Sequence, residues 1–331
     1  MLDVGIVGLG GIGNNHARCY TENKHSRVVA VCDIDKERAD KAASLWKAKP
    51  YYSVKQMLKS EINLDACSVT TAGIENGGDH YKPTMELLQA RIPVLGEKPI
   101  SNDVNKARKM VALAKKKRVP YGVNLNHRFT PSAVRAKEWL KKGRLGELNI
   151  VNMTMWINNP NESTPWFHIR ALHPHSLDVM RYFAGDVEFV QAFFKKGKGR
   201  KIWSNVQANL LFKNGVIGHL TGSYDAGGSY GLETLELVGS DGRVVINEAC
   251  EKLSFYPRFS REVESFDHLG GMGAFPETFQ SRIGVWIDDL RTNTPPSKID
   301  AKAEDALRVQ LIIESIIKSW ETRKIVKVSQ G

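Results

Sequence analysis

The stretch from Val4 to Asp33, VGIVGLGGIGNNHARCYTENKHSRVVAVCD, decides the fold of the first part of the chain. It opens on a short apolar run, 4–7, of the kind that forms a buried strand in a parallel sheet. A GxGxxG motif follows at 8–13, then a helix-like segment at 14–21 and a second apolar run at 28–32. This order of strand, glycines, helix and strand predicts a dinucleotide-binding βαβ unit.

Glycine is required at each of three positions of the motif for a different physical reason. Gly8 allows the tight turn, Gly10 lets the backbone approach a pyrophosphate, and Gly13 lets the helix pack on the strand. The helix N-terminus presents unpaired N–H groups and partial positive charge to the phosphates. Asp33, twenty residues beyond Gly13, is placed to accept hydrogen bonds from the adenosine ribose hydroxyls. The predicted cofactor contacts of this loop are Gly8, Gly10, Gly11, Ile12 and Gly13.

The length of 331 residues suggests two domains, and the element pattern changes near residue 122. From 1 to 122, short strands alternate with helices, which predicts a Rossmann domain, α/β, with a doubly wound parallel sheet. The predicted strands after Asp33 are 64–70, 92–95 and 121–124, and the predicted helices are 35–47, 53–59, 83–89 and 104–117. Because loops at the carboxyl ends of parallel strands face the ligand, Thr70 and Thr71 are candidate cofactor contacts.

Residues 123–331 predict a second, α+β domain for substrate binding and oligomerisation, built on a large, mainly antiparallel open sheet. Its predicted strands are 148–157, 187–194, 206–212, 216–223, 232–238, 243–246 and 252–256. We expect helices at 131–142, 174–183, 275–290 and 303–320 to cover one face. An uncovered second face would suit a homodimer or homotetramer.

The composition narrows the classes of partner. The formal charge of +11 permits nucleic acid, but the densest basic clusters, 115–118 and 195–201, do not interleave aromatic residues as a single-strand platform does. We therefore expect solvated basic faces and no nucleic-acid partner, with an anionic substrate still open.

No apolar run approaches the ~20 residues that span a bilayer, so no membrane partner is predicted. The chain enters its first strand without a signal-peptide pattern, and its four cysteines show no CxxC spacing. Both features fit reduced thiols and predict a cytoplasmic protein.

Four features of the sequence resemble the Gfo/Idh/MocA oxidoreductase family. They are the glycine motif with Asp33, the segment from His80 to Glu97-Lys98-Pro99, Asn126-His127-Arg128-Phe129, and His175-Ser176-Leu177-Asp178. The resemblance spans residues 4–185 and implies a Rossmann domain followed by an open-sheet domain. It also implies NAD(P)-dependent hydride transfer between nicotinamide C4 and a secondary alcohol of a sugar, cyclitol or related polyol. By the same resemblance, His80, Glu97, Lys98 and Asn126 join the predicted cofactor contacts.

The resemblance implies that Lys98 and His175, from different domains, sit beside the nicotinamide as the catalytic residues. Hydride removal from a carbinol carbon needs a base for the hydroxyl proton and a cation for the developing alkoxide. A partly desolvated lysine at a strand's carboxyl end has a lowered pKa and can share that proton. Pro174 can start a helix whose dipole favours a neutral His175. Asp178 either orients that ring or is simply a first-turn acid.

Two positions depart from the family pattern. Many members carry an aspartate four residues before this histidine, where this chain has Ala171, and His173 replaces a usual glycine. If the aspartate relays protons or grips substrate hydroxyls, His173, His168 or Arg170 takes that role here. The departure leaves open an atypical substrate or a loss of activity.

Other candidates have structural alternatives. Trp156 is a candidate stacking wall for a sugar ring or a core or interface residue, and Tyr230 is a substrate contact or a plain loop residue. Arg128 contacts substrate or ties the two domains together, and His80 contacts the nicotinamide half or caps the following helix. His168, His173 and His175 suggest a metal site, but no acid or cysteine joins them at a telling spacing, so we expect none.

Asp33 favours NAD because its carboxylate would repel a 2′-phosphate. Lys36 and Arg38 lie close enough in sequence to keep NADP open. The predicted function is an NAD(P)-dependent dehydrogenase acting on CH–OH groups of a small polyol or sugar. Two alternatives remain: a non-catalytic cofactor-binding sensor or regulatory protein, and an enzyme that recycles its nicotinamide during glycoside hydrolysis or epimerisation.

Overall fold

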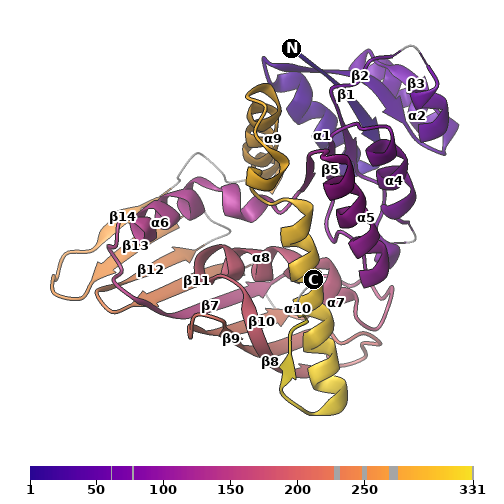
Figure 1. The fold of residues 1–331 in the computed structure, drawn as a ribbon. Coiled ribbons are helices and arrows are strands. Elements are labelled where there is room, and N and C mark those ends of the chain that lie inside the picture. The colour runs from indigo at the N-terminus through magenta and orange to yellow at the C-terminus, as the bar shows by residue number, and fades with distance from the viewer. Residues whose placement is uncertain (61, 77, 227–231, 248–251, 268–274, 330–331) are drawn as a thin grey trace. The chain divides into compact units, whose positions relative to one another are not determined.

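The computed structural model (Figure 1) describes residues 1–329 apart from 61, 77, 227–231, 248–251 and 268–274. The chain divides into two compact units. The first contains Met1–Leu125 and Phe279–Leu307, and the second contains Asn126–Thr278 and Arg308–Gly331.

The first unit is built on a parallel sheet of six strands in the order β3-β2-β1-β4-β5-β6. The strands are β1 (Leu2–Val7), β2 (Ser26–Cys32), β3 (Lys49–Tyr51), β4 (Ala66–Val69), β5 (Val94–Gly96) and β6 (Tyr121–Val123). The helices are α1 (Gly11–Glu22), α2 (Lys36–Trp46), α3 (Val54–Leu58), α4 (Tyr81–Gln89) and α5 (Val104–Lys117). This strand order is that of the doubly wound dinucleotide-binding fold, so the predicted fold class is confirmed.

A helix from late in the sequence completes the core of the first unit. In α9 (Phe275–Arg291), the buried side chains of Phe279, Ile283, Trp286 and Ile287 join the cluster that contains Val4. The prediction that this helix covers the sheet of the second domain is wrong from residue 279 onward. Helical periodicity shows that a face is buried, but it does not show which sheet the face packs against.

The second unit is built on nine strands in the order β14-β13-β12-β11-β7-β10-β9-β8-β15, and only the β7–β10 pair is parallel. The strands are β7 (Leu148–Trp156), β8 (Val187–Lys195), β9 (Asn205–Phe212), β10 (Ile217–Ser223), β11 (Leu232–Gly239), β12 (Gly242–Asn247), β13 (Lys252–Pro257), β14 (Glu264–Phe266) and β15 (Val326–Lys327). The helical segments are η2 (Asn126–Phe129), α6 (Pro131–Lys141), α7 (Phe167–Ala171), α8 (His173–Ala184) and α10 (Ala303–Thr322), of which the first turn of α10 belongs to the first unit. The predicted large, mainly antiparallel sheet is confirmed.

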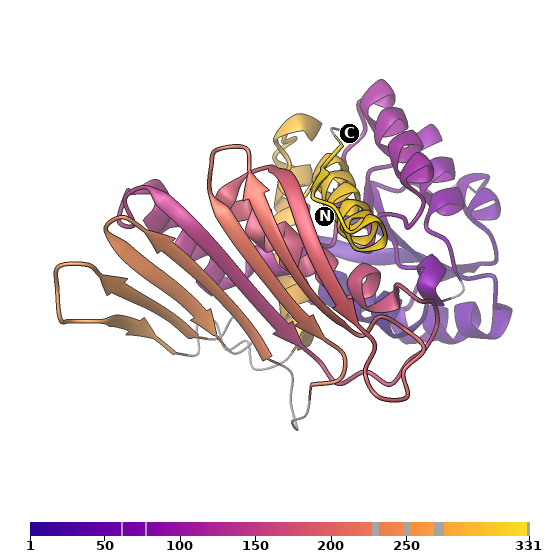
Figure 2. The same ribbon diagram turned by 90° about the horizontal axis from the view of Figure 1, so that it is seen from below.

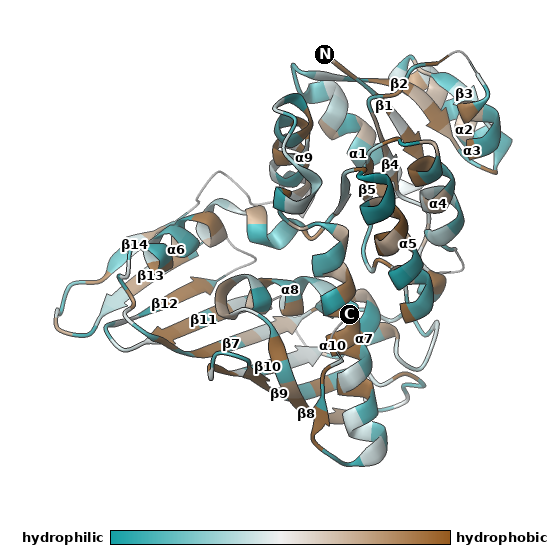
Figure 3. Ribbon diagram, in the orientation of Figure 1, coloured by the Kyte–Doolittle hydropathy of each residue, from teal (hydrophilic) through white to brown (hydrophobic). Residues whose placement is uncertain are grey.

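The two faces of this sheet differ in composition. In β9, Val206, Ala208, Leu210 and Phe212 are buried, while Gln207, Asn209 and Leu211 are exposed. The buried set faces the helices, and Figure 2 shows the sheet from the opposite, open side. In Figure 3 apolar and polar colours both occur along the strands of this sheet, as expected for a sheet with only one face in a core. Within the described part of the chain, no helix has the length and apolar character needed to cross a membrane.

Gly222 lets helix α8 approach strand β10 closely. A Cβ at this position would lie 2.0 Å from Nε2 of His173 and 2.4 Å from its Cε1. The ring is buried and cannot move away easily. Gly222 therefore fixes the distance between the sheet and the helix that carries His175.

Gly222→Ala is expected to lower the free energy of unfolding by about 2–3 kcal/mol, because the new methyl group overpacks a buried site. The matched control is Gly284→Ala in α9, where a Cβ meets no atom within 4 Å and helix propensity favours alanine. Urea unfolding measures both. Equal midpoints for the two variants would contradict the packing argument.

Candidate active site

The glycine loop of the first unit has the geometry that a dinucleotide cradle requires. Gly8 has a φ of +93°, and a Cβ there would lie 2.5 Å from the backbone nitrogen of Thr71. A Cβ at Gly13 would lie 1.9 Å from the carbonyl oxygen of Gly8. No other residue fits either position, because one needs a left-handed backbone and the other a direct contact between helix and turn.

Gly10 and Gly11 border open space, since a Cβ at either residue would meet no described atom within 4 Å. Gly10 is the N-cap residue of α1, and no side-chain cap bond is present there. The first N–H groups of α1 are thus presented toward this space, where a pyrophosphate fits both their hydrogen-bonding capacity and the helix dipole. Ile12 lies in the same turn with 39% of its surface exposed.

Asp33 directly follows β2 and faces the glycine loop. One of its carboxylate oxygens accepts a hydrogen bond from Leu9 N at 2.8 Å, and the other accepts one from Asp35 N at 3.0 Å. Nη1 of Arg38 lies 3.7 Å from the carboxylate. A carboxylate offers about four acceptor positions, so these backbone bonds orient Asp33 and leave acceptor capacity for ribose hydroxyls.

Thr70 bonds to the glycine loop, whereas Thr71 bonds to the segment that precedes α4. Oγ1 of Thr70 donates to the carbonyl oxygen of Gly8 at 2.7 Å, which braces the tight turn. Oγ1 of Thr71 lies 3.0 Å from Nδ1 of His80. His80 occupies the N-cap position of α4, but its ring makes no cap bond. Burial lowers the pKa of His80, so the ring is neutral near pH 7.

Glu97 is the centre of a buried hydrogen-bond network in the first unit. Its Oε1 lies 3.0 Å from Nε2 of His16 and accepts a bond from the amide of Asn124 at 2.6 Å. Its Oε2 accepts a bond from the backbone N–H of Lys98 at 3.2 Å. Burial acts to raise the pKa of Glu97, but the hydrogen bond and charge of His16 and the charge of Lys98 outweigh it and hold the pKa below its ordinary value.

Lys98 follows β5 at the carboxyl edge of the sheet, and its peptide bond to Pro99 is cis. Burial lowers the pKa of its amine, and the negative charge of Glu97 acts in the opposite sense. The amine therefore releases a proton more readily than an exposed lysine, which suits a residue that shares a substrate proton. His16 and Asn124 are not among the residues predicted from the sequence, although His16 lies beside Ala17 on the face of α1 that becomes buried.

In the second unit, His175 stands in the first turn of α8 and stacks on His127 from η2. The ring centroids are 4.2 Å apart and the planes differ by 24°. Nδ1 of His127 lies 2.8 Å from a carboxylate oxygen of Glu233 in β11. The sequence analysis assigned no role to His127 or Glu233. A signal was present for Glu233, because it shares the inward parity of Leu235 and Leu237 in a predicted strand.

Asp178 and Arg128 form a buried ion pair with two hydrogen bonds, of which the bond from Nε measures 2.7 Å. The guanidinium also lies over the ring of Tyr182, with 5.1 Å between its carbon and the centroid. These contacts all lie within the second unit, where they join η2 to α8. Asp178 therefore has a third role, as the partner of Arg128, that the sequence analysis did not consider.

His168 and His173 form a buried pair. Their Nε2 atoms are 3.0 Å apart, and Nδ1 of His173 lies 3.0 Å from Oγ of Ser176. Burial lowers the pKa of His168 to about 3, and burial, with the neighbouring imidazole of His168, lowers the pKa of His173. Both rings are neutral and packed between α7, α8 and the sheet, where His173 meets Gly222.

Each of the remaining predicted site residues that the structure describes contacts a different part of the second unit. Arg170 makes two hydrogen bonds to Glu314 of α10, at 3.0 and 2.9 Å. Asn126 donates to Oγ1 of Thr278. Trp156 ends β7 on the open side of the sheet, where it lines a hollow of about 590 Å³ with residues of β8, β9 and β10. Tyr230 lies outside the described residues.

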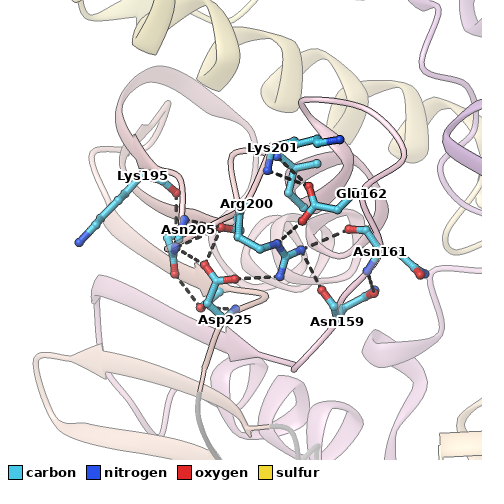
Figure 4. A network of polar contacts seen from close by, with 12 residues as sticks. Asn159, Asn161, Glu162, Lys195, Arg200, Lys201, Asn205 and Asp225 are labelled. Atoms are coloured by element: carbon cyan, nitrogen blue, oxygen red, sulfur yellow. Dashed lines mark hydrogen bonds and ion pairs between the residues drawn. The ribbon is translucent and has the colours of Figure 1, made fainter.

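A network around Arg200 fastens the loop that leads into α7 (Figure 4). Its guanidinium donates to the carbonyl oxygens of Asn159 and Asn161 and to the carboxylate of Asp225, and it pairs with Glu162. Three segments, 159–162, 200–205 and 223–225, are thereby joined. In the described part of the chain, no group of three or more His, Cys, Asp or Glu side chains could hold a metal ion.

A doubly wound parallel sheet, an open glycine cradle at a helix N-terminus and an acid after the second strand define a dinucleotide-binding protein. A family model described as "Oxidoreductase family, NAD-binding Rossmann fold" matches residues 2–125, and the GFO/IDH/MocA C-terminal domain matches residues 133–245.

Two curated relatives extend the match. Inositol 2-dehydrogenase of Rubrobacter xylanophilus is 30% identical over 318 residues, which cover 90% of this chain and 85% of the relative. Myo-inositol 2-dehydrogenase of Thermotoga maritima is 23% identical, with coverage of 99% and 98%. Among solved structures, a levoglucosan dehydrogenase in complex with NADH shares the fold, with a TM-score of 0.87, 18% identity and full coverage of both chains.

The chain therefore belongs to the Gfo/Idh/MocA family, and it is an oxidoreductase with NAD as its cofactor. The family and the cofactor that the sequence analysis predicted are confirmed.

Asp33→Ser is expected to weaken NADH binding about 10- to 100-fold, because charge-assisted hydrogen bonds to the ribose are lost. Binding of NADPH should weaken less, since the carboxylate that repels a 2′-phosphate is also lost. Nicotinamide fluorescence titration measures both constants. Asp35→Ser, at the exposed N-cap of α2, is the control and should leave both unchanged. Equal effects of the two substitutions would contradict the role of Asp33.

Proposed function

We propose that this protein is an NAD-dependent dehydrogenase that acts on a secondary alcohol of a sugar, cyclitol or related polyol. Lys98 carries the proposal: a buried lysine with a lowered pKa, held by Glu97 at the carboxyl edge of an NAD-binding sheet. Relatives named as inositol and levoglucosan dehydrogenases support the substrate class.

The glycine loop and Asp33 would hold the cofactor, with Gly10 and Gly11 at the pyrophosphate and Asp33 at the adenosine ribose. When bound there, NAD would supply the hydride acceptor for the oxidation of the carbinol carbon. The chain's own part is to bind and orient the polyol and to take the hydroxyl proton.

We assign that proton to Lys98 and His175. The neutral amine of Lys98 accepts it, and the resulting ammonium stabilises the alkoxide that develops as the carbon is oxidised. His175 is proposed to contact the same hydroxyl from the first turn of α8. Arg128 and Asp178, which are paired with each other, hold η2 against that helix.

Lys98→Met is expected to lower kcat with the best polyol about 10²- to 10⁴-fold, because the proton acceptor is removed, while NADH affinity stays within threefold. In the wild type, the oxidation rate should rise with pH through a pKa below the ordinary lysine value of 10.5, since only the neutral amine accepts a proton. This rise of the rate with pH should be absent from the Lys98→Met variant.

The measurement is NADH formation over a panel of myo-inositol, levoglucosan, glucose and other polyols. Lys106→Met is the control, because Lys106 pairs with Asp79 at the surface. NADH binding without turnover of any polyol would support a sensor, the alternative that Ala171 motivates. Product formed from a co-purified cofactor, without net NADH, would support a recycled nicotinamide.

We further propose that the open face of the nine-stranded sheet joins copies of this chain into a homodimer or homotetramer. The register aligns Phe189, Leu211, Ile217, Ile150 and Val238 in one apolar row across five strands. Ile217 is 53% exposed and Leu211 38%, which is unusual for aliphatic side chains at the centre of a sheet. A second copy would bury this row.

The double variant Leu211→Glu/Ile217→Glu is expected to reduce the assembly to single chains at micromolar concentration, because charge is placed in an apolar interface. Sedimentation velocity measures the mass. Val263→Glu, on the loop between β13 and β14, is the control and should keep the wild-type mass. A wild-type protein that sediments as a monomer would contradict the assignment.

We also assign the protein to the cytoplasm. Cys19, Cys32 and Cys67 are free and buried, and burial raises the pKa of each thiol, to about 11 for Cys19 and about 12 for Cys32. Such thiols are unreactive and suit a reducing compartment.

A further inference from the structure

We propose that His127 and Glu233 form a hydroxyl-binding site in the second unit, which takes a substrate hydroxyl at Nε2 of His127. The inference rests on the proposed function, because it names the residue that grips the polyol beside His175. It would supply the acceptor that Ala171 cannot, since Ala171 has no polar side-chain atom.

The hydrogen bond to Glu233 decides which nitrogen of His127 is available. A carboxylate is an acceptor only, so Nδ1 of His127, 2.8 Å from Oε1, carries the hydrogen and donates. In the neutral ring, Nε2 is then a bare acceptor. It can accept a hydrogen bond from a hydroxyl group, as an aspartate carboxylate would.

Nε2 of His127 is buried and has no hydrogen-bond partner among the described residues. His127 as a whole is 5% exposed, and Glu233 is 6% exposed. An unsatisfied ring nitrogen in such surroundings costs stability, so its presence needs an explanation. A ligand hydroxyl provides one, because its donation to Nε2 would complete the bonding of the ring.

The position of the dyad ties it to the proposed chemistry. The His127 ring stacks on the His175 ring with 4.2 Å between centroids, so a hydroxyl bound at His127 would lie next to the group that His175 contacts. Neighbouring hydroxyl groups on adjacent carbons are the defining feature of sugars and cyclitols. The stacked pair therefore suits a polyol better than a simple alcohol.

The other side chains considered for this role are engaged elsewhere. His168 and His173 share a hydrogen bond and pack into the core. Arg170 is bound to Glu314 of α10. The His127–Glu233 dyad is thus the candidate that combines a fixed tautomer, an available acceptor and contact with His175.

The test uses the full chain with saturating NADH and compares binding of myo-inositol, levoglucosan and their monodeoxy analogues by calorimetry, with kcat and KM measured for the same panel in NAD. His127→Phe keeps a stacking ring and removes the acceptor. We expect it to weaken binding of the best polyol about 10- to 100-fold, with NADH affinity within twofold. Glu233→Leu should act in the same direction, because it releases the tautomer.

The deoxy analogues supply a readout that a purely structural role would not move. One monodeoxy analogue should lose affinity for the wild type but bind His127→Phe as well as the parent polyol does. His127→Gln, which retains an acceptor, should recover part of the affinity. His25→Phe, on the α1–β2 loop, and Glu264→Gln, in β14, are the matched controls and should behave as wild type.

If the substituted chains fail to fold, nitrogen-15 NMR spectra of the histidine-labelled wild type test whether Nε2 of His127 binds the polyol. They should show the Nδ1–H tautomer of His127 and a shift of its Nε2 on adding the polyol. Turnover and binding unchanged by His127→Phe, or an Nε2 that does not respond, would overturn the hydroxyl site alone. Polyol binding without turnover would overturn the proposed dehydrogenase activity. The effect of His127→Phe on polyol affinity would then decide whether the hydroxyl site exists. No binding and no turnover would overturn both.

Discussion

The buried carboxylate of Glu97 is the constraint on which the first unit's chemistry depends. It is bonded to the ring of His16 in α1, to the amide of Asn124 after β6 and to the backbone of Lys98. The helix whose N-terminus faces the cofactor cradle is therefore fixed to the peptide that carries Lys98. Removing one partner from such a buried network leaves charge and polar atoms unsatisfied, which costs several kcal/mol.

In the second unit, several polar side chains near α7 and α8 pair with one another. Arg128 is held by Asp178, Arg170 by Glu314, and His168 by His173, while Arg200 joins three loop segments. This pairing builds a stiff support behind α7 and α8. His127, by contrast, stacks on His175 and bonds Glu233, and it is the residue that we propose binds a substrate hydroxyl.

Local signals in the sequence predicted most of the fold. The stretch from Val4 to Asp33 was sufficient for the βαβ unit, because the positions of Gly8 and Gly13 admit only glycine. The alternation of apolar and polar residues predicted the strands of the second sheet and the difference between its two faces. The placement of α9 was missed, since an apolar helical face does not identify its partner, and short elements such as β3, α7, β14 and β15 carry too few residues for a periodic signal.

The site was less predictable for a physical reason. Contacts between residues far apart in the sequence, such as His127 with Glu233 or His16 with Glu97, depend on the register of strands and the rotation of helices. Residue types alone suggested His168, His173 and Arg170 as substitutes for the missing aspartate, yet His168 and His173 bond each other in the core and Arg170 bonds the partly exposed Glu314. A charged residue at an inward strand position, Glu233, was the one local sign of the dyad.

The central claim is that Lys98 and His175 handle one substrate proton as a unit, and a double-mutant cycle on kcat tests it most directly. Lys98→Met, His175→Asn and the double variant are compared with wild type on the best polyol, with NADH affinity as the internal check. The account predicts that the double variant loses about as much rate as the worse single variant, because residues that act together are non-additive. Losses that multiply, or a His175→Asn variant with wild-type kcat, would contradict it.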